Sequence, residues 1–298
     1  MKKLLLLLLL LAAAWGFYEG SDESGAIRPQ HSAPAEELAP SSGGLGEWFR
    51  TIAAGLTGLP LEDLLPAGGA PREETPPPPR TDAPAETGDA PSVFQDLRDL
   101  THFQDALESR LDRSRFVPSE DIPPLLKQAV VAAEDRRFYE HGAIDLMSVV
   151  RAAAANYMAG TTVEGGSTLS QQTVKNVFLS GERTMTRKVR EFFLAVQLEK
   201  YYTKDQILEI YLNTIYFGHG AYGVGEACRT YFGCEPKDLT LAQCAMIAGL
   251  PQAPSAYDPI DHPEEAKKRM SIVLMLMARE GYISPEEAAK AAMTSLLE

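Results

Sequence analysis

Helix-start signals recur along the second two-thirds of this 298-residue chain and predict a mainly helical fold. Thr203, Thr240 and Ser284 are each followed three residues later by Gln or Glu, which is the pattern of a capping box. Pro124 opens an apolar run at helical spacing, and another helix is predicted over residues 144–159. Since the sequence contains no alternating apolar run of useful length, no sheet is predicted.

The first twenty residues are predicted to direct the chain to a membrane. Lys2 and Lys3 precede fifteen uncharged residues at positions 4–18. As a helix this stretch would be roughly 22 Å long, shorter than the ~30 Å hydrocarbon core of a bilayer. It is either a signal peptide cleaved after the small residues 12–14, or an anchor with an aromatic belt at 15–18. In both cases the lysines stay in the cytoplasm and the rest of the chain is extracytoplasmic.

The composition changes after the hydrophobic segment. Residues 21–92 hold 12 of the 21 prolines and 12 acidic against 4 basic residues, so they carry −8 of the formal charge of −13. Low hydrophobicity, proline and net charge predict a disordered or extended linker with a short apolar stretch at 48–65. Residues 93–298 are therefore the predicted folded domain. The acidic balance excludes nucleic-acid binding through a broadly basic surface.

Three further patterns resemble binding sites, but each is predicted to have a structural role. The glycines at 218–223 match GxGxxG, but no alternation of strands and helices surrounds them, so a loop is predicted. The cysteines contain no CxxC pair, which favours buried thiols, with a bridge between the first two as the alternative: Cys228, Cys234 and Cys244. Helical spacing predicts core packing for three methionines: Met270, Met275 and Met277.

Glu134 is the first candidate catalytic residue. It follows an apolar run at 130–133 that should be buried, and a partly desolvated carboxyl at that position suits a general base. If the helix continues beyond it, Phe138 and His141 share its face. The alternative is a solvated acid at a helix end.

A second candidate region begins at a glycine pair. Gly165-Gly166 precedes Ser167 and Thr168, which can cap a helix whose free backbone N–H groups suit an anion or a sugar. Gln171 and Gln172 follow in the first turn. Many helices begin in this way, so capping alone is the alternative.

Cations gather around a second acid, Glu191. Lys188 precedes it by three residues and therefore shares its helical face. Such a group would suit a diphosphate, or it would be a solvated helix face with routine ion pairs. The cations are Lys175, Arg183, Arg187 and Lys188.

Together these stretches resemble the family 51 glycosyltransferases, the peptidoglycan transglycosylases, which occur alone or as the N-terminal half of class A penicillin-binding proteins. The family motif EDxxFxxHxG begins at Glu134, with Ala143 in place of its last glycine. Four further motifs are intact and in order: GGSTxxQQ at 165–172, RKxxExxxAxxLE at 187–199, KxxILExYLN at 204–213 and RxxxVLxxM at 269–277. The resemblance covers residues 93–298.

The resemblance implies a mainly α, lysozyme-like domain with a smaller membrane-proximal jaw subdomain. It also implies polymerisation of lipid II into β-1,4-linked glycan strands, with inversion at the anomeric carbon. Glu134 would be the general base. Glu191 would act near the donor diphosphate, either by holding a divalent cation, Mg or Mn, or by orienting the surrounding cations. No organic cofactor is implied.

The remaining roles follow the same motifs. Cations would neutralise the leaving diphosphate: Lys188, Arg187, Arg183 and Lys175. Polar side chains would line the donor side: Ser167, Thr168, Gln171 and Gln172. The expected partners are lipid II, the growing strand, the membrane and other cell-wall synthesis proteins, with no nucleic acid. Residues 177–179 are predicted to form an exposed apolar strip facing the membrane, or else to end their helix inside the core.

Two rival functions remain from the sequence. One is a lysozyme-like enzyme that cleaves peptidoglycan, and the other is a non-catalytic scaffold that binds lipid or cell-wall partners. The sequence printed here contains no SxxK and no KTG, which a penicillin-binding transpeptidase would require. Residues 280–289 nevertheless resemble the connector to such a domain, so a stand-alone enzyme and part of a bifunctional protein are both expected possibilities.

Overall fold

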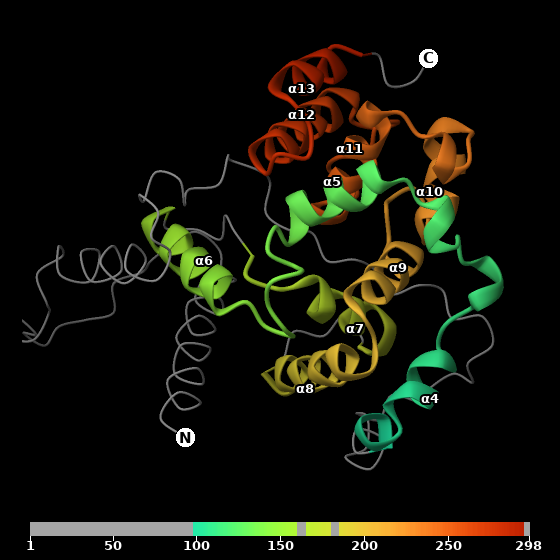
Figure 1. Cartoon of the computed structure of the whole chain (residues 1–298), viewed down its shortest axis with the longest axis vertical. Helices are drawn as coiled ribbons and strands as arrows, with labels where there is room; N and C mark the ends of the chain where they lie inside the picture. Colours follow the sequence, from blue (N-terminus) through green and yellow to red (C-terminus); the bar gives the residue numbers. More distant parts are fainter. Residues whose placement is uncertain (1–97, 160–164, 180–184, 295–298) are drawn as a thin grey trace, which may run out of the picture. The chain divides into compact units, whose positions relative to one another are not determined.

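The computed structural model describes residues 98–159, 165–179 and 185–294. This part of the chain is mainly α, as predicted, and its only strand-like pairing is one antiparallel bridge between Tyr216 and Tyr222. The α-helices, shown in Figure 1, are α4 (Phe103–Glu108), α5 (Pro124–Glu134), α6 (Leu146–Ala159), α7 (Leu169–Phe178), α8 (Met185–Tyr201), α9 (Lys204–Thr214), α10 (Val224–Phe232), α11 (Leu241–Gly249), α12 (Pro263–Arg279) and α13 (Pro285–Ala292). Four 3₁₀ turns join them: η2 (Arg113–Arg115), η3 (Ser119–Asp121), η4 (Pro236–Asp238) and η5 (Leu250–Gln252).

Helix α6 belongs to a separate compact unit, whose described part lies within Leu146–Gly166. The helix begins two residues later than predicted. The Gly166 backbone packs closely on Val149, since a Cβ at position 166 would lie 3.0 Å from the Val149 Cα. The jaw subdomain implied by the resemblance stays a prediction.

The larger unit is built around α5. Its apolar face, which includes Leu126, Ala129 and Val130, is fully buried. That face packs against α11 and α12, and Figure 1 shows the three helices side by side. Helix α7 packs separately against α8 and α9. The apolar run read from the sequence therefore holds the C-terminal end of α5, and with it Glu134, in the folded domain.

Four capping boxes set helix starts in the larger unit. The N-cap side chain accepts from the backbone N–H three residues later, and the Gln or Glu at that position accepts from the N-cap N–H. The boxes predicted at Thr203, Thr240 and Ser284 are confirmed. The fourth begins α7, with Thr168 as its N-cap and Gln171 as its partner.

Glu134 ends its helix, as predicted, and the continuation that would have put Phe138 and His141 on its face does not occur. Asp135 has φ −158° and ψ 73°, so α5 ends there, and Phe138 and His141 lie in the following loop. The physical reason is a tertiary contact, since the Asp135 carboxylate accepts from the backbone N–H of Leu169 at 2.9 Å. No spacing rule within one helix could reveal that bond.

The exposed apolar strip predicted at residues 177–179 is also wrong. Phe178 and Leu179 are only 5% and 8% exposed, and both belong to the hydrophobic core. The Phe178 ring stacks on Phe103 with centroids 5.5 Å apart, and the Arg110 guanidinium lies 4.7 Å from its centroid. The alternative, in which these residues end their helix inside the core, is confirmed.

Exposed apolar side chains occur instead on α8. Val189, Phe193 and Val196 are spaced four and three residues apart, which places them on one face of the helix, and all three are exposed. We call these three residues the α8 stripe. An exposed helix face is normally polar, so the stripe requires a functional explanation.

The loop predicted for the GxGxxG pattern is confirmed. It joins α9 to α10, and its glycines at 218, 220 and 223 all have positive φ. Gly223 has φ 83°, and a Cβ there would lie 2.7 Å from the Asn213 carbonyl oxygen. Glycine is therefore required by the turn itself.

The cysteine and methionine predictions have different outcomes. The three cysteines are free; Cys228 and Cys244 are buried, and Cys234 is half-buried. Burial raises the pKa of the Cys244 thiol to about 12, which keeps it protonated at neutral pH. Met270 and Met277 are core residues as predicted, but Met275 is 50% exposed, because it lies on the outer face of α12.

Replacing Phe178 by alanine should lower the free energy of unfolding by about 3–5 kcal/mol, since it removes a buried ring that stacks on another. Phe193→Ala on the exposed α8 stripe is the matched control and should change stability by about 0.5 kcal/mol or less. Urea unfolding of the three proteins measures both values. Equal stability losses in the two variants would contradict the burial described here.

Candidate active site

Glu134 is the last residue of α5 and is half-buried. Buried Val130, Val131 and Ala132 precede it, so the helix end cannot move freely away from the core. The side chain of Gln172, from α7, donates its Nε2 hydrogen bond to Glu134 Oε2 at 3.0 Å. A carboxylate in this setting is oriented by a neutral donor, which leaves it able to accept a proton.

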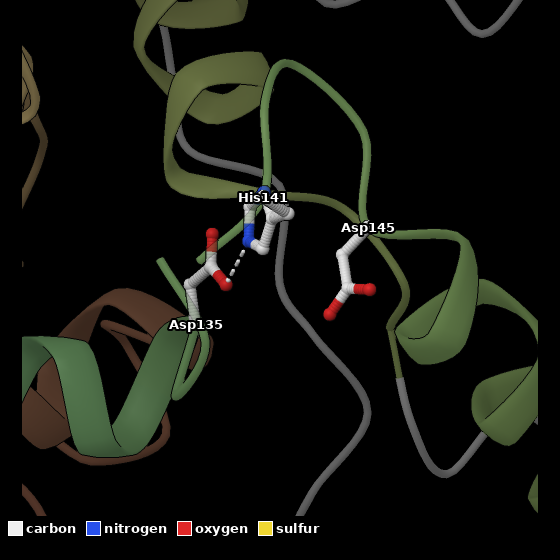
Figure 2. A group of neighbouring side chains, drawn as sticks. All are labelled: Asp135, His141 and Asp145. Atoms are coloured by element: carbon white, nitrogen blue, oxygen red, sulfur yellow. Dashed lines mark hydrogen bonds and ion pairs between the residues drawn. The ribbon is translucent and has the colours of Figure 1, made fainter. Parts of the chain in front are cut away.

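The loop after Glu134 is attached to the start of α7 at two points. Asp135 Oδ2 accepts from the Leu169 backbone N–H at 2.9 Å, and Thr168 Oγ1 donates to the Ala143 carbonyl at 2.8 Å. Figure 2 shows the third link, in which the His141 ring turns towards Asp135, with Nε2 and Oδ1 2.8 Å apart. The carboxylate therefore stabilises both the loop and the positive end of α7.

Phe138, in the same loop, lies against a cation from another motif. Lys204 Nζ lies 4.4 Å from the Phe138 ring centroid and donates to Glu199 Oε1 at 2.7 Å. The same Glu199 oxygen accepts from Ser170 Oγ. Residues of three motifs thus support the loop, and the sequence analysis assigned no role to Lys204 or Glu199. Their positions in the motifs were the only available signal.

Tyr139 gives the loop a further contact with α9. Its hydroxyl donates to Asp205 Oδ1 at 3.0 Å. Burial and the nearby Asp205 carboxylate raise the pKa of Tyr139 to about 12, so the hydroxyl remains a donor at neutral pH. This contact holds the outer part of the loop against the start of α9.

Glu191 on α8 forms the second centre. Its side chain is 2% exposed, with Lys188 Nζ on Oε1 and Arg187 Nη1 3.3 Å from Oε2. Lys188 Nζ also donates to Ser167 Oγ at 3.2 Å. Two cations therefore surround one buried carboxylate, and this small region is positively charged in a chain that is acidic overall.

The segment that begins α7 joins the two centres. Gln172 contacts Glu134, and Ser167, five residues earlier, contacts Lys188 beside Glu191. Residues 167–172 therefore contact Glu134 directly and contact Glu191 through Lys188. Lys188 links the glycine-rich motif to the cation group, because its Nζ contacts both Ser167 and Glu191.

The other predicted binding residues have varied positions. Thr168 and Gln171 are buried, and their side chains form the capping box of α7. Lys175 lies half-buried late in α7, and Arg183 falls outside the described residues. Substrate contacts by these residues stay predictions.

A divalent cation at Glu191 does not fit this geometry. Both carboxylate oxygens already contact cationic side chains, whereas Mg²⁺ binds carboxylate and water oxygens. Acidic groups close enough to hold a metal do occur elsewhere in the described residues: Asp135, His141 and Asp145, and separately His219, Asp258 and Asp261. Glu191 belongs to neither group, so its role as an orienter of cations is the one that the contacts favour.

None of the described helices is long and apolar enough to cross a bilayer. The predicted signal or anchor at residues 4–18 lies outside the described residues.

Comparisons with known proteins point to one family. Residues 102–278 match the family described as Transglycosylase. Penicillin-binding protein 1F of Bacillus subtilis (strain 168) is 48% identical over 175 residues, which are 59% of this chain and 24% of the relative. Penicillin-binding protein 1A of Neisseria flavescens is 49% identical over 179 residues, covering 60% of this chain and 22% of the relative. The chain thus spans about a quarter or less of these relatives' length.

One solved structure is also similar. The crystal structure of penicillin-binding protein 1A from Haemophilus influenzae matches with 28% identity and a TM-score of 0.37. The match covers 61% of this chain and 17% of that one.

Proposed function

The chain belongs to the transglycosylase family, and we propose that its domain is a peptidoglycan glycosyltransferase that polymerises lipid II on the extracytoplasmic side of the membrane. The match spans 102–278 and contains both acids of the candidate site. The substrates would be lipid II and a growing strand, each carried on undecaprenyl diphosphate.

Glu134 would act as the general base. Its carboxylate accepts the proton of the acceptor sugar's 4-hydroxyl as that oxygen attacks the donor's anomeric carbon. The new β-1,4 bond forms on the face opposite the breaking bond, so the α-linked donor is inverted. The hydrogen bond from Gln172 supports this role, because it orients one carboxylate oxygen without protonating the other.

The cation group would receive the leaving diphosphate. The bond between the anomeric carbon and the diphosphate oxygen breaks with its electron pair, and the resulting negative charge is stabilised by Lys188 and Arg187. Glu191 orients these two side chains through its two oxygens. A diphosphate needs little protonation to leave, so no second proton donor is required.

The contacts of Glu191 carry this proposal. A lysozyme-like hydrolase would place its second functional acid as a protonated donor in an apolar pocket. Here the carboxylate lies against two cationic side chains and not in an apolar pocket, and such a cation group suits a negatively charged leaving group. Incubation of the purified protein with lipid II, followed by strand-length analysis, tests the activity. Products without new glycan bonds would support the hydrolase or the scaffold instead.

The α8 stripe is the surface that we propose meets the lipid. It lies on the same helix as Lys188 and Glu191, and its exposed side chains could remain with the lipid tail while the cations hold the diphosphate. This assignment replaces residues 177–179, of which Phe178 and Leu179 are buried.

Glu134→Gln should lower the rate of polymerisation by about 10²–10⁴-fold, because the amide keeps the shape of the side chain but accepts no proton. Lipid II binding and thermal stability should stay near the values of the unaltered protein. Glu140→Gln, an exposed acid of the same loop that pairs with Arg137, is the control and should polymerise normally. A Glu134→Gln protein within a few-fold of full activity would remove Glu134 from the role of base.

Lys188→Ala should weaken binding of moenomycin, which mimics the donor in this family, by roughly 10- to 100-fold, as expected for one charged hydrogen bond. Lys200→Ala is the control, since this lysine is exposed and at the other end of α8. Isothermal titration or competition with a labelled inhibitor measures the difference. Equal affinities for both variants would place the diphosphate site elsewhere.

Phe193→Ser with Val196→Ser should reduce liposome binding of a protein that begins at residue 93 by more than tenfold, since each buried apolar side chain contributes about 1.5–3 kcal/mol. The paired control is Lys200→Ser with Thr186→Ser, two polar positions on the same helix face. Vesicle flotation with neutral lipids measures binding, and circular dichroism checks the fold. Absence of liposome binding by the unsubstituted 93–298 protein at low salt would assign all membrane attachment to residues 1–92.

A further inference from the structure

The His141 ring lies between two hydrogen-bond acceptors. Nε2 is 2.8 Å from Asp135 Oδ1, and Nδ1 is 2.6 Å from the Gly142 carbonyl oxygen. A carbonyl only accepts, and an ionised carboxylate only accepts, so both ring nitrogens must carry a proton to satisfy both contacts. The doubly protonated ring, an imidazolium, is therefore the form that fits both contacts.

The charges around the ring agree with this protonation state. Figure 2 shows Asp135 and Asp145 on either side of His141. The side chains of His141 and Asp135 are 5% and 4% exposed. Asp145 is also buried and pairs with Arg137 at 3.7 Å, whereas Lys204 is the cation that opposes the imidazolium.

Burial alone would favour a neutral ring. The hydrogen bond to Asp135, the negative charge of that residue and the hydrogen bond to the Gly142 carbonyl outweigh burial and the charge of Lys204, and so raise the pKa of His141. The charged form thus persists to a higher pH than in an exposed histidine.

The imidazolium completes a set of hydrogen bonds between the loop after Glu134 and the start of α7, which we call the frame. Asp135, held by His141 through one oxygen, accepts from the Leu169 N–H through the other. Two residues beyond His141, the Ala143 carbonyl accepts from Thr168 Oγ1. The ring thus connects the two parts of the loop that bind the helix start, Asp135 and the segment that contains Ala143. Without its charge, one of the two ring contacts must be lost.

We infer that His141 is a positioning residue, which as an imidazolium clamps the loop after Glu134 to the first turn of α7 and thereby keeps Gln172 on the catalytic carboxylate. Gln172 is three residues after Leu169 on the same helix, so a shift of the helix start moves its amide relative to Glu134. This role rests on the proposed function of Glu134 as base. It requires neither substrate contact nor proton transfer by His141.

The frame has a defined dependence on pH. The folded-state pKa of His141 is raised, so its contribution is fully present below the unfolded value near 6.5 and is lost as the pH rises through the folded value. The catalytic rate constant should therefore fall on the alkaline side, in the direction opposite to the deprotonation that a general base needs.

The charge state is tested by ¹⁵N NMR of the full-length protein in detergent, with histidine labelled in both ring nitrogens. The chain has five histidines. One of them should keep both N–H groups to a higher pH than the others, and His141→Gln should remove that signal. Asp135→Asn should move its titration to lower pH, since the amide can still accept from Leu169 but carries no charge. A neutral His141 ring at pH 6 would overturn the inference.

Activity on lipid II provides the second readout. His141→Gln should lower kcat by roughly 10- to 100-fold with little change in KM, and should abolish the alkaline fall seen in the unsubstituted protein. The control is His102→Gln, at an exposed histidine in α4's N-cap position. If His141→Gln keeps the full kcat and the same pH profile, the positioning role is excluded. If the unsubstituted protein makes no strands, the proposed function fails, while the NMR result still decides the charge state.

Discussion

The capped N-terminus of α7 is the constraint on which the rest of the site depends. Backbone N–H groups at a helix start must find acceptors, and here Asp135 supplies one from a loop 34 residues earlier in the chain. That bond ends α5 at Glu134 and brings Gln172 onto the carboxylate. Ser167, just before the same helix start, contacts the cation beside Glu191. The start of one helix therefore contacts groups at both centres.

Local signals in the sequence were sufficient for most of the fold. Capping boxes at Thr203, Thr240 and Ser284 depend on residues three apart, and each begins a helix where it was predicted. Predictions that required knowledge of packing were less reliable. Phe178 was assigned to an exposed strip, although it stacks on Phe103, which lies 75 residues earlier in the chain. Helical periodicity predicts a buried face but not which neighbour covers it, and Met275 was misplaced for the same reason.

The site shows the same division between local and distant information. The contact of Lys188 with Glu191 follows from their spacing on one helix and was predicted. The end of α5 at Glu134 was also predicted, but the bond that fixes it, from the Leu169 backbone N–H to Asp135, was not. A shared helix face was expected for His141 only if the helix continued, and the residue instead belongs to a loop held by tertiary hydrogen bonds. The site therefore contains a half-buried base and a cation-paired acid. Sequence spacing alone could not show that these two groups are connected through the start of α7.

The central claim is that the two centres serve transfer between sugars and not hydrolysis. The most direct measurement counts, in one reaction of purified protein with lipid II, the β-1,4 bonds formed and the undecaprenyl diphosphate released. Both should rise together in equal amounts, and the new bonds should have the inverted configuration. Diphosphate release with free reducing sugars and no new glycan bonds would contradict it.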